Sequence, residues 1–499
     1  MWNVVDIMQK GIKGYMSGRL CFLTKEDCKE IHDTSVDILG ECGVKIESEY
    51  ALDKLSDFGC IVNRKNSIVK FPKYVIDDCL RYAPRSIKLY GRASKYDIKI
   101  ESGRTYTSTA SGYGIIDRNK KIARDGILND VAEGTLVAEN LDNIHSVIPF
   151  LTGVHDVPSE IASPIILGET FKNTNKTVEF YLTGGSNISS TLKDMDNVIK
   201  LSKIVAGSTF ELRKKPFLMF LISSISPLTY TEDQSRILFR TVEEGLPLVI
   251  MPAILSGMTG PVTIAGTLVQ SNAEFLAGLV MANSMKKGAP VMYGHSNTIL
   301  DMHTGIYSGG AVEMGLISAC IAQMGEYYDI PTNSYCPKSD SHISDQQVGY
   351  EKAIQWILGS LSGVSYLSGA GCVTSESLVS LEQLVIDNEV IGMVNRVNDG
   401  INITEETLAG DLIKYIGPGG NYMKTNHTTF WLNSEHFKPK ISQKDSYTQW
   451  LNNEEKDIVD VAAINVENIL EIEQSPVNND VIKDIDNFQN ELLKNINNI

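Results

Sequence analysis

Short apolar runs recur at regular intervals in the central part of the chain. Seven of them cover residues 144–151, 177–183, 217–223, 247–253, 290–294, 331–335 and 363–368, so successive runs start about 30 to 43 residues apart. The segments between them, such as 272–284 and 311–328, have the periodicity of helices. Runs that are apolar on both faces and alternate with helices are typical of a parallel sheet.

Seven strands at this spacing, with an eighth that the pattern does not reveal, favour a closed barrel over an open doubly wound sheet. We therefore predict an α/β protein with a (β/α)8 TIM barrel as its core over residues 141–374. An N-terminal cap over 1–140 should contain helices in residues 1–85 and short antiparallel strands in 86–118, where apolar and polar residues alternate. Thr24 and Asp27 have the spacing of a capping box. A helical extension is expected over 375–499, ending in a terminal helix or a frayed tail at 478–499.

The charge balance narrows the classes of partner. The 499 residues include 45 Lys and Arg against 61 Asp and Glu, a net charge of -16. This acidity disfavours nucleic acid, which needs a basic surface, and is compatible with a cationic substrate. No stretch reaches the roughly 18 consecutive apolar residues of a membrane helix, and Met1 to Arg19 lack the pattern of an export signal. We expect a cytoplasmic protein that contacts no membrane.

The eight cysteines give no sign of a metal site. They are scattered, with no Cys-x-x-Cys pair, so we interpret them as reduced and mostly buried thiols and expect no structural zinc.

Polar residues gather after the sixth apolar run. In a (β/α)8 barrel, chemistry takes place on the loops that follow the carboxyl ends of the strands. We therefore nominate four residues of one such loop as catalytic: Asp340, His342, Asp345 and Gln346. The histidines and carboxylates near these strand ends could bind a metal or simply line a pocket. Because none has the helical i, i+4 spacing of metal ligands, we favour the pocket.

Aromatic residues also collect near the strand ends. A trimethylammonium group has no N–H to donate, so proteins recognise it through the faces of aromatic rings and through carboxylates. A single ring of this kind is more often a core residue than part of a cage, and several at successive strand ends favour a cage more. As substrate-binding residues we nominate Tyr113, Glu179, Phe180, Tyr293, His295, Tyr307 and Tyr335.

A glycine-rich loop at 256–266 follows the fourth apolar run. Gly257, Gly260 and Gly266 keep the side chains short, which would let a flat cofactor approach the backbone closely. The alternative is a tight turn into the next helix. The loop lacks the Gly-Lys-Ser/Thr ending of a phosphate-binding loop.

Six short motifs occur together in a fixed order. They cover 256–274, YSGGAVE at 307–313 with EYYDIP at 326–331, DSHISDQ at 340–346, GYE at 349–351, LVIDNE at 384–389, and GPGG at 417–420 followed by NHT at 426–428. In this order they resemble the trimethylamine methyltransferase (MttB-like) family, and weaker similarity extends over nearly the whole chain.

The resemblance implies a (β/α)8 barrel that moves a methyl group from a methylated amine to the cobalt of a corrinoid, carried by a separate small protein. Founding members of the family carry pyrrolysine near the sixth strand end, at about 332–340 here, where this chain has only common residues. Members without pyrrolysine that have been assigned act on quaternary amines, so we expect glycine betaine or a related betaine as donor. The leaving group is then a neutral tertiary amine that needs no proton. We also expect a homo-oligomer and no bound metal.

Two other interpretations stay open. The chain could belong to this family and use another methyl donor, or it could bind a betaine or a corrinoid without turnover.

Overall fold

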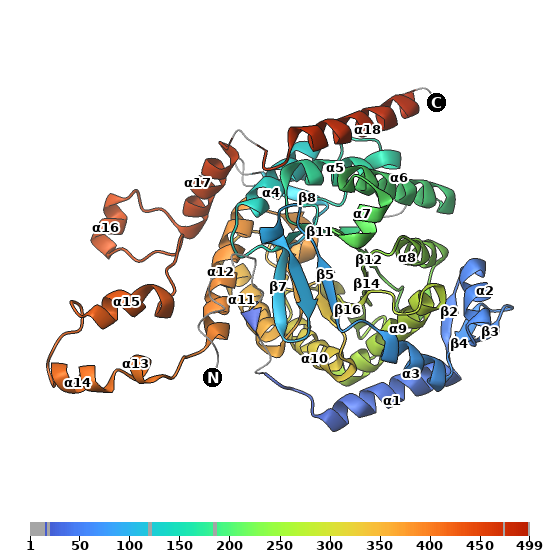
Figure 1. Ribbon diagram of the computed structural model, residues 1–499, viewed down its shortest axis with the longest axis horizontal. Helices are drawn as coiled ribbons and strands as arrows, with labels where there is room; N and C mark the ends of the chain where they lie inside the picture. Colours follow the sequence, from blue (N-terminus) through green and yellow to red (C-terminus); the bar gives the residue numbers. More distant parts are fainter. Residues whose placement is uncertain (1–14, 17–19, 118–121, 183–186, 473–474, 498–499) are drawn as a thin grey trace.

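Eight parallel strands close into a barrel in the computed structural model, which describes residues 15–16, 20–117, 122–182, 187–472 and 475–497. Neighbouring strands follow the order β7, β10, β11, β12, β14, β16, β19 and β20, and β20 pairs back with β7. The barrel strands are β7 (Arg104–Thr109), β10 (Ser146–Val147), β11 (Thr177–Tyr181), β12 (Leu218–Ile222), β14 (Leu248–Ile250), β16 (Val291–His295), β19 (Thr332–Ser334) and β20 (Tyr366–Ala370). Figure 1 shows the strands at the centre of a ring of helices. The predicted (β/α)8 barrel is confirmed.

The eighth strand, β7, lies in the segment that the sequence pattern assigned to the N-terminal cap. It pairs in parallel with β10 on one side and with β20 on the other, so the barrel begins before residue 141. Its sequence, RTYTST, is polar yet buried. The Thr105 hydroxyl donates to the Val364 carbonyl at 2.7 Å, and the Thr107 hydroxyl donates to the Asn143 carbonyl. These bonds make burial of the polar side chains tolerable, and they explain why an apolar pattern did not reveal the strand.

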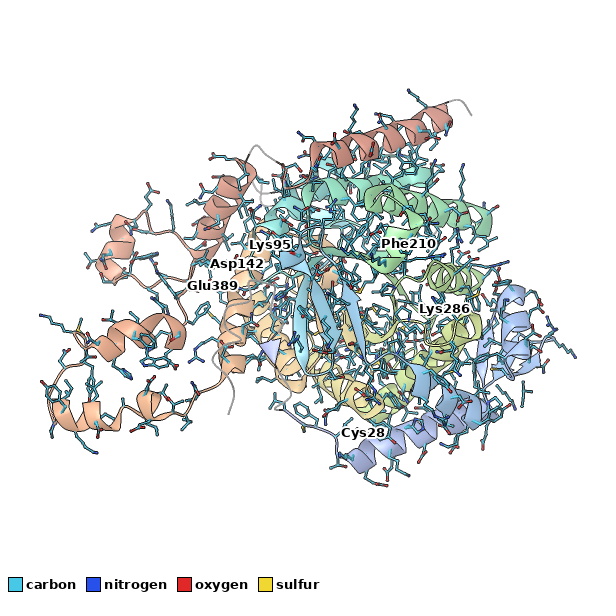
Figure 2. The ribbon with its side chains drawn as sticks, viewed as in Figure 1. Cys28, Lys95, Asp142, Phe210, Lys286 and Glu389 are labelled. Atoms are coloured by element: carbon cyan, nitrogen blue, oxygen red, sulfur yellow. The ribbon has the colours of Figure 1, made fainter. Side chains whose placement is uncertain are left out.

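The two faces of each strand meet different surroundings, because successive side chains of a strand point to opposite sides. Side chains directed into the barrel lumen form one cluster, which includes Tyr106, Met219, Leu221, Val249, Met251, Met292 and Tyr366. Their neighbours along the strands, such as Phe220 and Tyr293, pack outward against the helices in a separate core. Figure 2 shows side chains filling the space between the strands and the helices.

Helices cover the outside of the barrel. They are α4 (Leu128–Glu139), α5 (Ala162–Asn173), α6 (Ile188–Ala206), α7 (Thr209–Lys214), α8 (Glu232–Glu244), α9 (Ile264–Met285), α10 (Val312–Tyr328), α11 (Gln346–Ser362) and α12 (Leu381–Asp399). Within the described residues, α9 alone is long and apolar enough to cross a membrane. Because 78% of its most apolar window is buried inside the protein, it serves here as a core helix.

The N-terminal region caps one side and one end of the barrel. It contains α1 (Lys25–Glu41), α2 (Glu49–Asp57), α3 (Lys73–Tyr82), β2 (Val44–Ile46), β3 (Ile61–Asn63) and β4 (Ile68–Lys70), while β1 (Tyr15–Met16) pairs with β7. The capping box of Thr24 and Asp27 is present at the start of α1. The antiparallel hairpin of β5 (Ser86–Leu89) and β6 (Ile98–Glu101) closes the amino-terminal end of the lumen with Ile87 and Ile100. The sequence predicts no export signal in residues 1–19. Of this segment only residues 15 and 16 belong to the described part of the chain.

Small sheets extend over the opposite end, where the strands finish. One contains β15 (Leu255–Ser256), β17 (Thr298–Asp301) and β18 (Ile306–Ser308); another contains β8 (Gly114–Asp117), β9 (Ile122–Asp125), β21 (Cys372–Val373) and β22 (Leu378–Val379). The short strand β13 (Thr229–Tyr230) joins the N-terminal sheet through β2. These sheets form the walls of the barrel mouth.

The C-terminal part after α12 is helical and contains α13 (Glu405–Leu408), α14 (Gly410–Ile416), α15 (Asn426–Glu435), α16 (Tyr447–Asn452), α17 (Ile458–Leu470) and α18 (Asn479–Asn497). Helices α13 to α16 project from the barrel, whereas α18 lies along α5 and α6 (Figure 1). The predicted strand at 177–183 and tail at 478–499 each end in residues outside the described part.

Candidate functional site

A hollow of about 500 Å³ opens at the barrel mouth. Its walls are the β17–β18 hairpin, the loop after β19 and the turn between β21 and β22. The lining residues are Asp301, Thr304, Ile306, Tyr307, Ser308, Asp340, His342, Thr374, Ser375, Glu376 and Ser377. Three of them are carboxylates, and none is a lysine or an arginine. The surface of this mouth hollow is therefore suited to a cationic group.

Asp340 holds two walls of the mouth hollow together. Its carboxylate accepts hydrogen bonds from the Ser308 hydroxyl at 2.5 Å and from the Gly310 N–H at 3.0 Å on one side. On the other side it accepts a hydrogen bond from the Ser375 hydroxyl. The carboxylate thus fixes the relative positions of the hairpin and the turn.

Lys338 is a completely enclosed cation behind the mouth hollow. Its ammonium donates to the Ser296 hydroxyl at 2.8 Å and to the Tyr307 hydroxyl at 2.7 Å, and it lies 2.7 Å from the Glu376 carboxylate. The same nitrogen lies 5.1 Å from the centre of the Tyr307 ring and 5.0 Å from that of Tyr335. Its side chain has no exposed surface, whereas the side chain of Glu376 is 24% exposed.

The surroundings of Lys338 keep it charged. Burial by itself would lower the pKa of the ammonium, but the charge of the Glu376 carboxylate and the hydrogen bonds to Glu376 and Tyr307 outweigh this effect and raise the pKa. Burial raises the pKa of the Glu376 carboxyl, and the lysine opposes that rise. The pair therefore places one fixed positive charge and one partly accessible carboxylate at the mouth.

Glu376 belongs to a strained turn, η4 (Thr374–Glu376). All three of its residues have positive φ, at 52°, 51° and 80°, although none is a glycine. Such conformations cost about 1–3 kcal/mol each and persist only where surrounding contacts enforce them. Here the N–H groups of Thr374 and Ser375 donate to the carbonyls of Ser341 at 2.8 Å and Ser339 at 2.7 Å, within the loop that carries Lys338.

Glu179 occupies the lumen below the mouth. Burial raises the pKa of its carboxyl to about 8, even though the side chains of Ser368 and Asn333 donate to it. The Asn333 amide lies 3.0 Å from one oxygen, and the Ser368 hydroxyl lies 3.1 Å from the other. At neutral pH this carboxyl is mostly protonated, so it adds little negative charge to the lumen.

The seven nominated substrate-binding residues separate into two groups. Glu179 and Tyr335 face the lumen, and Tyr307 lines the mouth hollow. Tyr113 lies on the rim and is 73% exposed. Tyr307 and Tyr335 already contact the ammonium of Lys338, so they do not form an open cage.

Phe180, Tyr293 and His295 face away from the lumen, contrary to their nomination. Phe180 packs edge-on against Phe220, and Tyr293 stacks on Phe275 of α9 with the ring centres 4.0 Å apart. Burial lowers the pKa of His295 to about 3, so its ring is neutral, and its Nε2 lies 2.7 Å from the Ser334 hydroxyl. The physical reason is strand alternation: Glu179 points inward, so its neighbour Phe180 points outward.

The four nominated catalytic residues also occupy different places. Asp340 and His342 line the mouth hollow, and His342 Nδ1 lies 3.3 Å from the Thr374 hydroxyl. Asp345 is the N-cap of α11 and accepts from the Val348 N–H at 3.2 Å. Gln346 is the exposed first residue of the same helix. The structure thus brings the first two together and gives Asp345 a structural role.

Internal packing accounts for the three nominated glycines. Gly257 has φ of 95°, and a Cβ there would lie 2.7 Å from the Met302 side chain. At Gly260 a Cβ would lie 2.4 Å from Ile254, and at Gly266 it would lie 2.7 Å from Pro261. The tight-turn interpretation therefore explains these residues without a cofactor.

Sequence reasoning missed Lys338 and Glu376. A lone lysine in a polar loop carries no signal of burial, and the contact partners Ser296, Tyr307 and Glu376 come from distant segments. The signal that was present is the position of Lys338 directly after a barrel strand.

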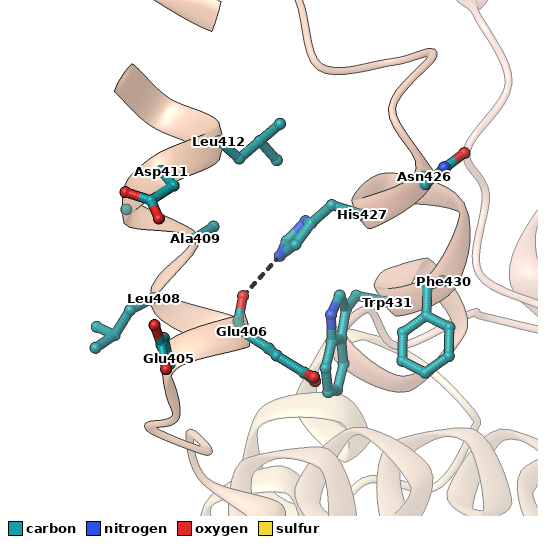
Figure 3. A pocket seen from close by; sticks show the side chains of 11 residues that line it. Glu405, Glu406, Leu408, Ala409, Asp411, Leu412, Asn426, His427, Phe430 and Trp431 are labelled. Atoms are coloured by element: carbon teal, nitrogen blue, oxygen red, sulfur yellow. Dashed lines mark hydrogen bonds between the residues drawn. The ribbon is translucent and has the colours of Figure 1, made fainter. Parts of the chain in front are cut away.

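A larger hollow of about 720 Å³ lies outside the barrel, between α13–α14 and α15 (Figure 3). His427 Nε2 lies 3.2 Å from the Glu406 carbonyl there, and Trp431 and Phe430 form part of the wall. Its lining also includes the carboxylates of Glu405, Glu406 and Asp411. Because this hollow lies on helices that project from the barrel, whereas chemistry in a (β/α)8 barrel takes place at the carboxyl ends of the strands, we place the chemistry at the barrel mouth instead. Within the described ranges, no three His, Cys, Asp or Glu side chains are grouped to hold a metal ion.

Two comparisons with known sequences agree on one family. The model of the family described as trimethylamine methyltransferase (MTTB) matches residues 8–492. A trimethylamine methyltransferase MttB of Desulfitobacterium hafniense is 31% identical over 472 residues, covering 94% of this chain and 93% of that protein. A glycine betaine methyltransferase of the same species, strain Y51, is 28% identical over 438 residues, covering 88% and 90%.

Among solved structures, the monomethylamine methyltransferase of Methanosarcina barkeri is 13% identical, with a TM-score of 0.47 and coverage of 90% of this chain and 99% of that one. The fold assignment rests on the strand order rather than on this likeness. Because the family match extends over nearly the whole chain and a relative is 31% identical along 94% of it, the chain belongs to the trimethylamine methyltransferase family and is a methyltransferase.

Proposed function

We propose that this methyltransferase takes a methyl group from a quaternary amine, glycine betaine or a related betaine, and delivers it to the Co(I) of a corrinoid carried by a small partner protein. The observation that carries the proposal is the mouth hollow, where Asp301, Asp340 and Glu376 face the cavity without a lysine or arginine in its lining. Such a surface attracts a permanent cation, which cannot donate a hydrogen bond.

Two sequence facts support the choice of a quaternary amine. One relative along most of the chain is named a glycine betaine methyltransferase. In addition, residues 332–340, the segment near which founding members of the family carry pyrrolysine, contain only common amino acids in this chain. A quaternary ammonium leaves as a neutral tertiary amine, so the enzyme has no proton to supply at nitrogen.

The chain's contribution is then binding and orientation. The corrinoid, when its carrier protein is docked, supplies the nucleophilic cobalt that accepts the methyl group. Asp340 fixes the hairpin and the turn around the amine, and the carboxylates hold the cation in line with the mouth. Exclusion of water by the docked partner would strengthen these charge interactions.

The rim of the mouth fits a docked protein. Apolar side chains are exposed on several loops at this end: Met258 and Val262 after β14, Met302 and Ile306 on the β17–β18 hairpin, and Ile343 after β19. Exposed apolar surface gathered on one face is typical of a protein–protein contact. We infer that the corrinoid protein covers this rim, so that its cofactor faces the mouth hollow.

The test uses the purified enzyme with reduced cob(I)alamin as a free acceptor. With glycine betaine we expect loss of the Co(I) absorbance, growth of the methylcobalamin spectrum and one dimethylglycine for each methyl transferred. Trimethylamine should give none. Turnover of trimethylamine with no turnover of any betaine would overturn the proposed donor, and betaine binding without transfer would instead indicate a non-catalytic binding protein.

A further inference from the structure

We propose that Lys338, Ser296 and Tyr307 form a binding site for a substrate carboxylate, and that Glu376 occupies this site as a displaceable internal ligand. The inference rests on the proposed function of the mouth and makes its substrate a zwitterion, with an anionic group as well as a quaternary ammonium.

The contacts of Lys338 require an anion. An ammonium has three N–H donors, and the Ser296 hydroxyl, the Tyr307 hydroxyl and the Glu376 carboxylate receive them. Two of these acceptors are neutral, so Glu376 alone balances the charge. Because an enclosed cation without a counter-charge is costly, a second carboxylate must take the place of Glu376 whenever the glutamate leaves.

The surroundings of Glu376 allow its carboxylate to be displaced from Lys338. Among the described contacts, Lys338 is the only partner of its carboxylate, and the side chain keeps 24% of its surface exposed to the mouth hollow. Its backbone has φ of 80° within the strained turn η4. Release of the carboxylate can relieve part of this strain, which offsets part of the cost of breaking the ion pair.

The ion pair of Lys352 with Asp387 shows the contrasting arrangement. Both side chains are 1% exposed, and they come from the regular helices α11 and α12. The Asp387 carboxylate also accepts from the Gly371 N–H at 2.7 Å and the Gln383 amide at 2.9 Å. That carboxylate is held by several donors and has no route to solvent, whereas Glu376 has one partner and an open side.

Exchange of partners would suit a betaine. When the substrate carboxylate binds Lys338, the carboxylate of Glu376 is set free in the same hollow that contains Asp340. The ammonium of the substrate then has carboxylates around it, and the number of paired charges does not fall. A cation without a carboxylate, such as tetramethylammonium, can use the carboxylates but cannot displace Glu376 from Lys338.

The experiment measures binding by titration calorimetry of glycine betaine and of tetramethylammonium, with the melting temperature recorded for each variant. Lys338→Met should weaken glycine betaine binding about ten- to hundredfold, the range expected for a lost charge-assisted contact, and should change tetramethylammonium binding less than about threefold. Glu376→Gln removes the competing carboxylate and leaves Lys338 in place. It should bind glycine betaine about tenfold more tightly, because Asp301 and Asp340 remain for the ammonium while the substrate carboxylate no longer has a competitor at Lys338.

The second variant keeps the proposal testable if Lys338→Met fails to fold. Unchanged or weaker binding of glycine betaine by Glu376→Gln would overturn the inference, as would an equal loss for both ligands in Lys338→Met. Failure of the proposed function looks different: binding would follow the expected pattern, but cob(I)alamin would receive no methyl group.

Discussion

Two pairs of an enclosed lysine and a carboxylate lie close together in the sequence but differ in the exposure and the partners of the carboxylate. The Lys352–Asp387 pair joins two helices behind β20, and both of its members are enclosed and bound by additional groups. The Lys338–Glu376 pair crosses the barrel mouth from a loop to a strained turn and is open to a hollow on one side. The difference teaches that burial of a charge does not by itself indicate function. The mouth pair is distinguished by its carboxylate, which is partly exposed to the hollow and can therefore leave the lysine.

The largest expected effect concerns the enclosed pair. Replacement of Lys352 by Met leaves the Asp387 carboxylate buried without its cation, so the free energy of unfolding should fall by about 3–5 kcal/mol. Chemical denaturation at pH 7 measures this directly. The matched variant Lys338→Met should lose clearly less stability, because the exposed side of Glu376 lets its carboxylate turn to solvent. Equal losses would erase the distinction between the two pairs.

The variant Asp340→Ala tests whether the mouth hollow is needed for methyl transfer. Asp340→Ala removes the acceptor that joins Ser308 and Gly310 to Ser375, so the walls of the hollow lose their alignment. We expect methyl transfer to fall roughly a hundredfold, in line with the cost of misplaced groups at an active site, and the melting temperature to fall by only a few degrees. Asp345→Ala is the control, since it removes only a helix N-cap. Parallel losses of stability and activity in Asp340→Ala would make that residue structural.

Glu179 provides a third arrangement, an enclosed carboxyl without a cation. In an unfolded chain this acid ionises near its ordinary value of 4.5, whereas in the folded protein burial raises its pKa to about 8. Between these values the native state binds more protons than the unfolded state, so the free energy of unfolding should fall as pH rises from about 4.5 to about 8. Glu179→Gln should flatten this decline and stabilise the protein by roughly 1–3 kcal/mol at pH 8. Denaturation curves at pH 5 and pH 8 provide the measurement, and an unchanged slope would contradict the raised pKa.

The smallest expected effect concerns strain in the turn that carries Glu376. Thr374 has φ of 52°, which glycine adopts without penalty. Thr374→Gly should therefore change the free energy of unfolding by less than about 1 kcal/mol, in the stabilising direction. Lower stability in this variant would show that the threonine side chain contributes more than its backbone costs, and that little strain is available to release Glu376.

Much of the fold was predictable because apolar strands and helical segments alternate. Each of the seven apolar runs overlaps a barrel strand, and the capping box at Thr24 starts α1 as predicted. The pattern did not reveal the eighth strand, because it contains the polar residues Thr105 and Thr107. Their burial is possible only through hydrogen bonds to distant carbonyls. Such partners are invisible in the local sequence.

The candidate site was predictable only in part. Position after a barrel strand drew attention to Asp340, His342, Tyr307 and Tyr335, which lie at or near the mouth and whose roles stay predictions. The same criterion failed for Phe180, Tyr293 and His295 because it ignores which face of a strand a side chain occupies. Adjacent residues such as Glu179 and Phe180 cannot both face the lumen, so strand alternation would have corrected the nomination from sequence alone.

The sequence by itself determined the barrel and the family and indicated the strand-end loops as the candidate site, because hydrophobic periodicity and short motifs are local properties of the chain. Only the tertiary structure decided that Lys338 is enclosed, that Glu376 is its counter-charge and that the Tyr307 hydroxyl and the Tyr335 ring contact its ammonium. The reason is physical: burial and charge pairing depend on groups that are remote in the chain and meet only when the barrel closes.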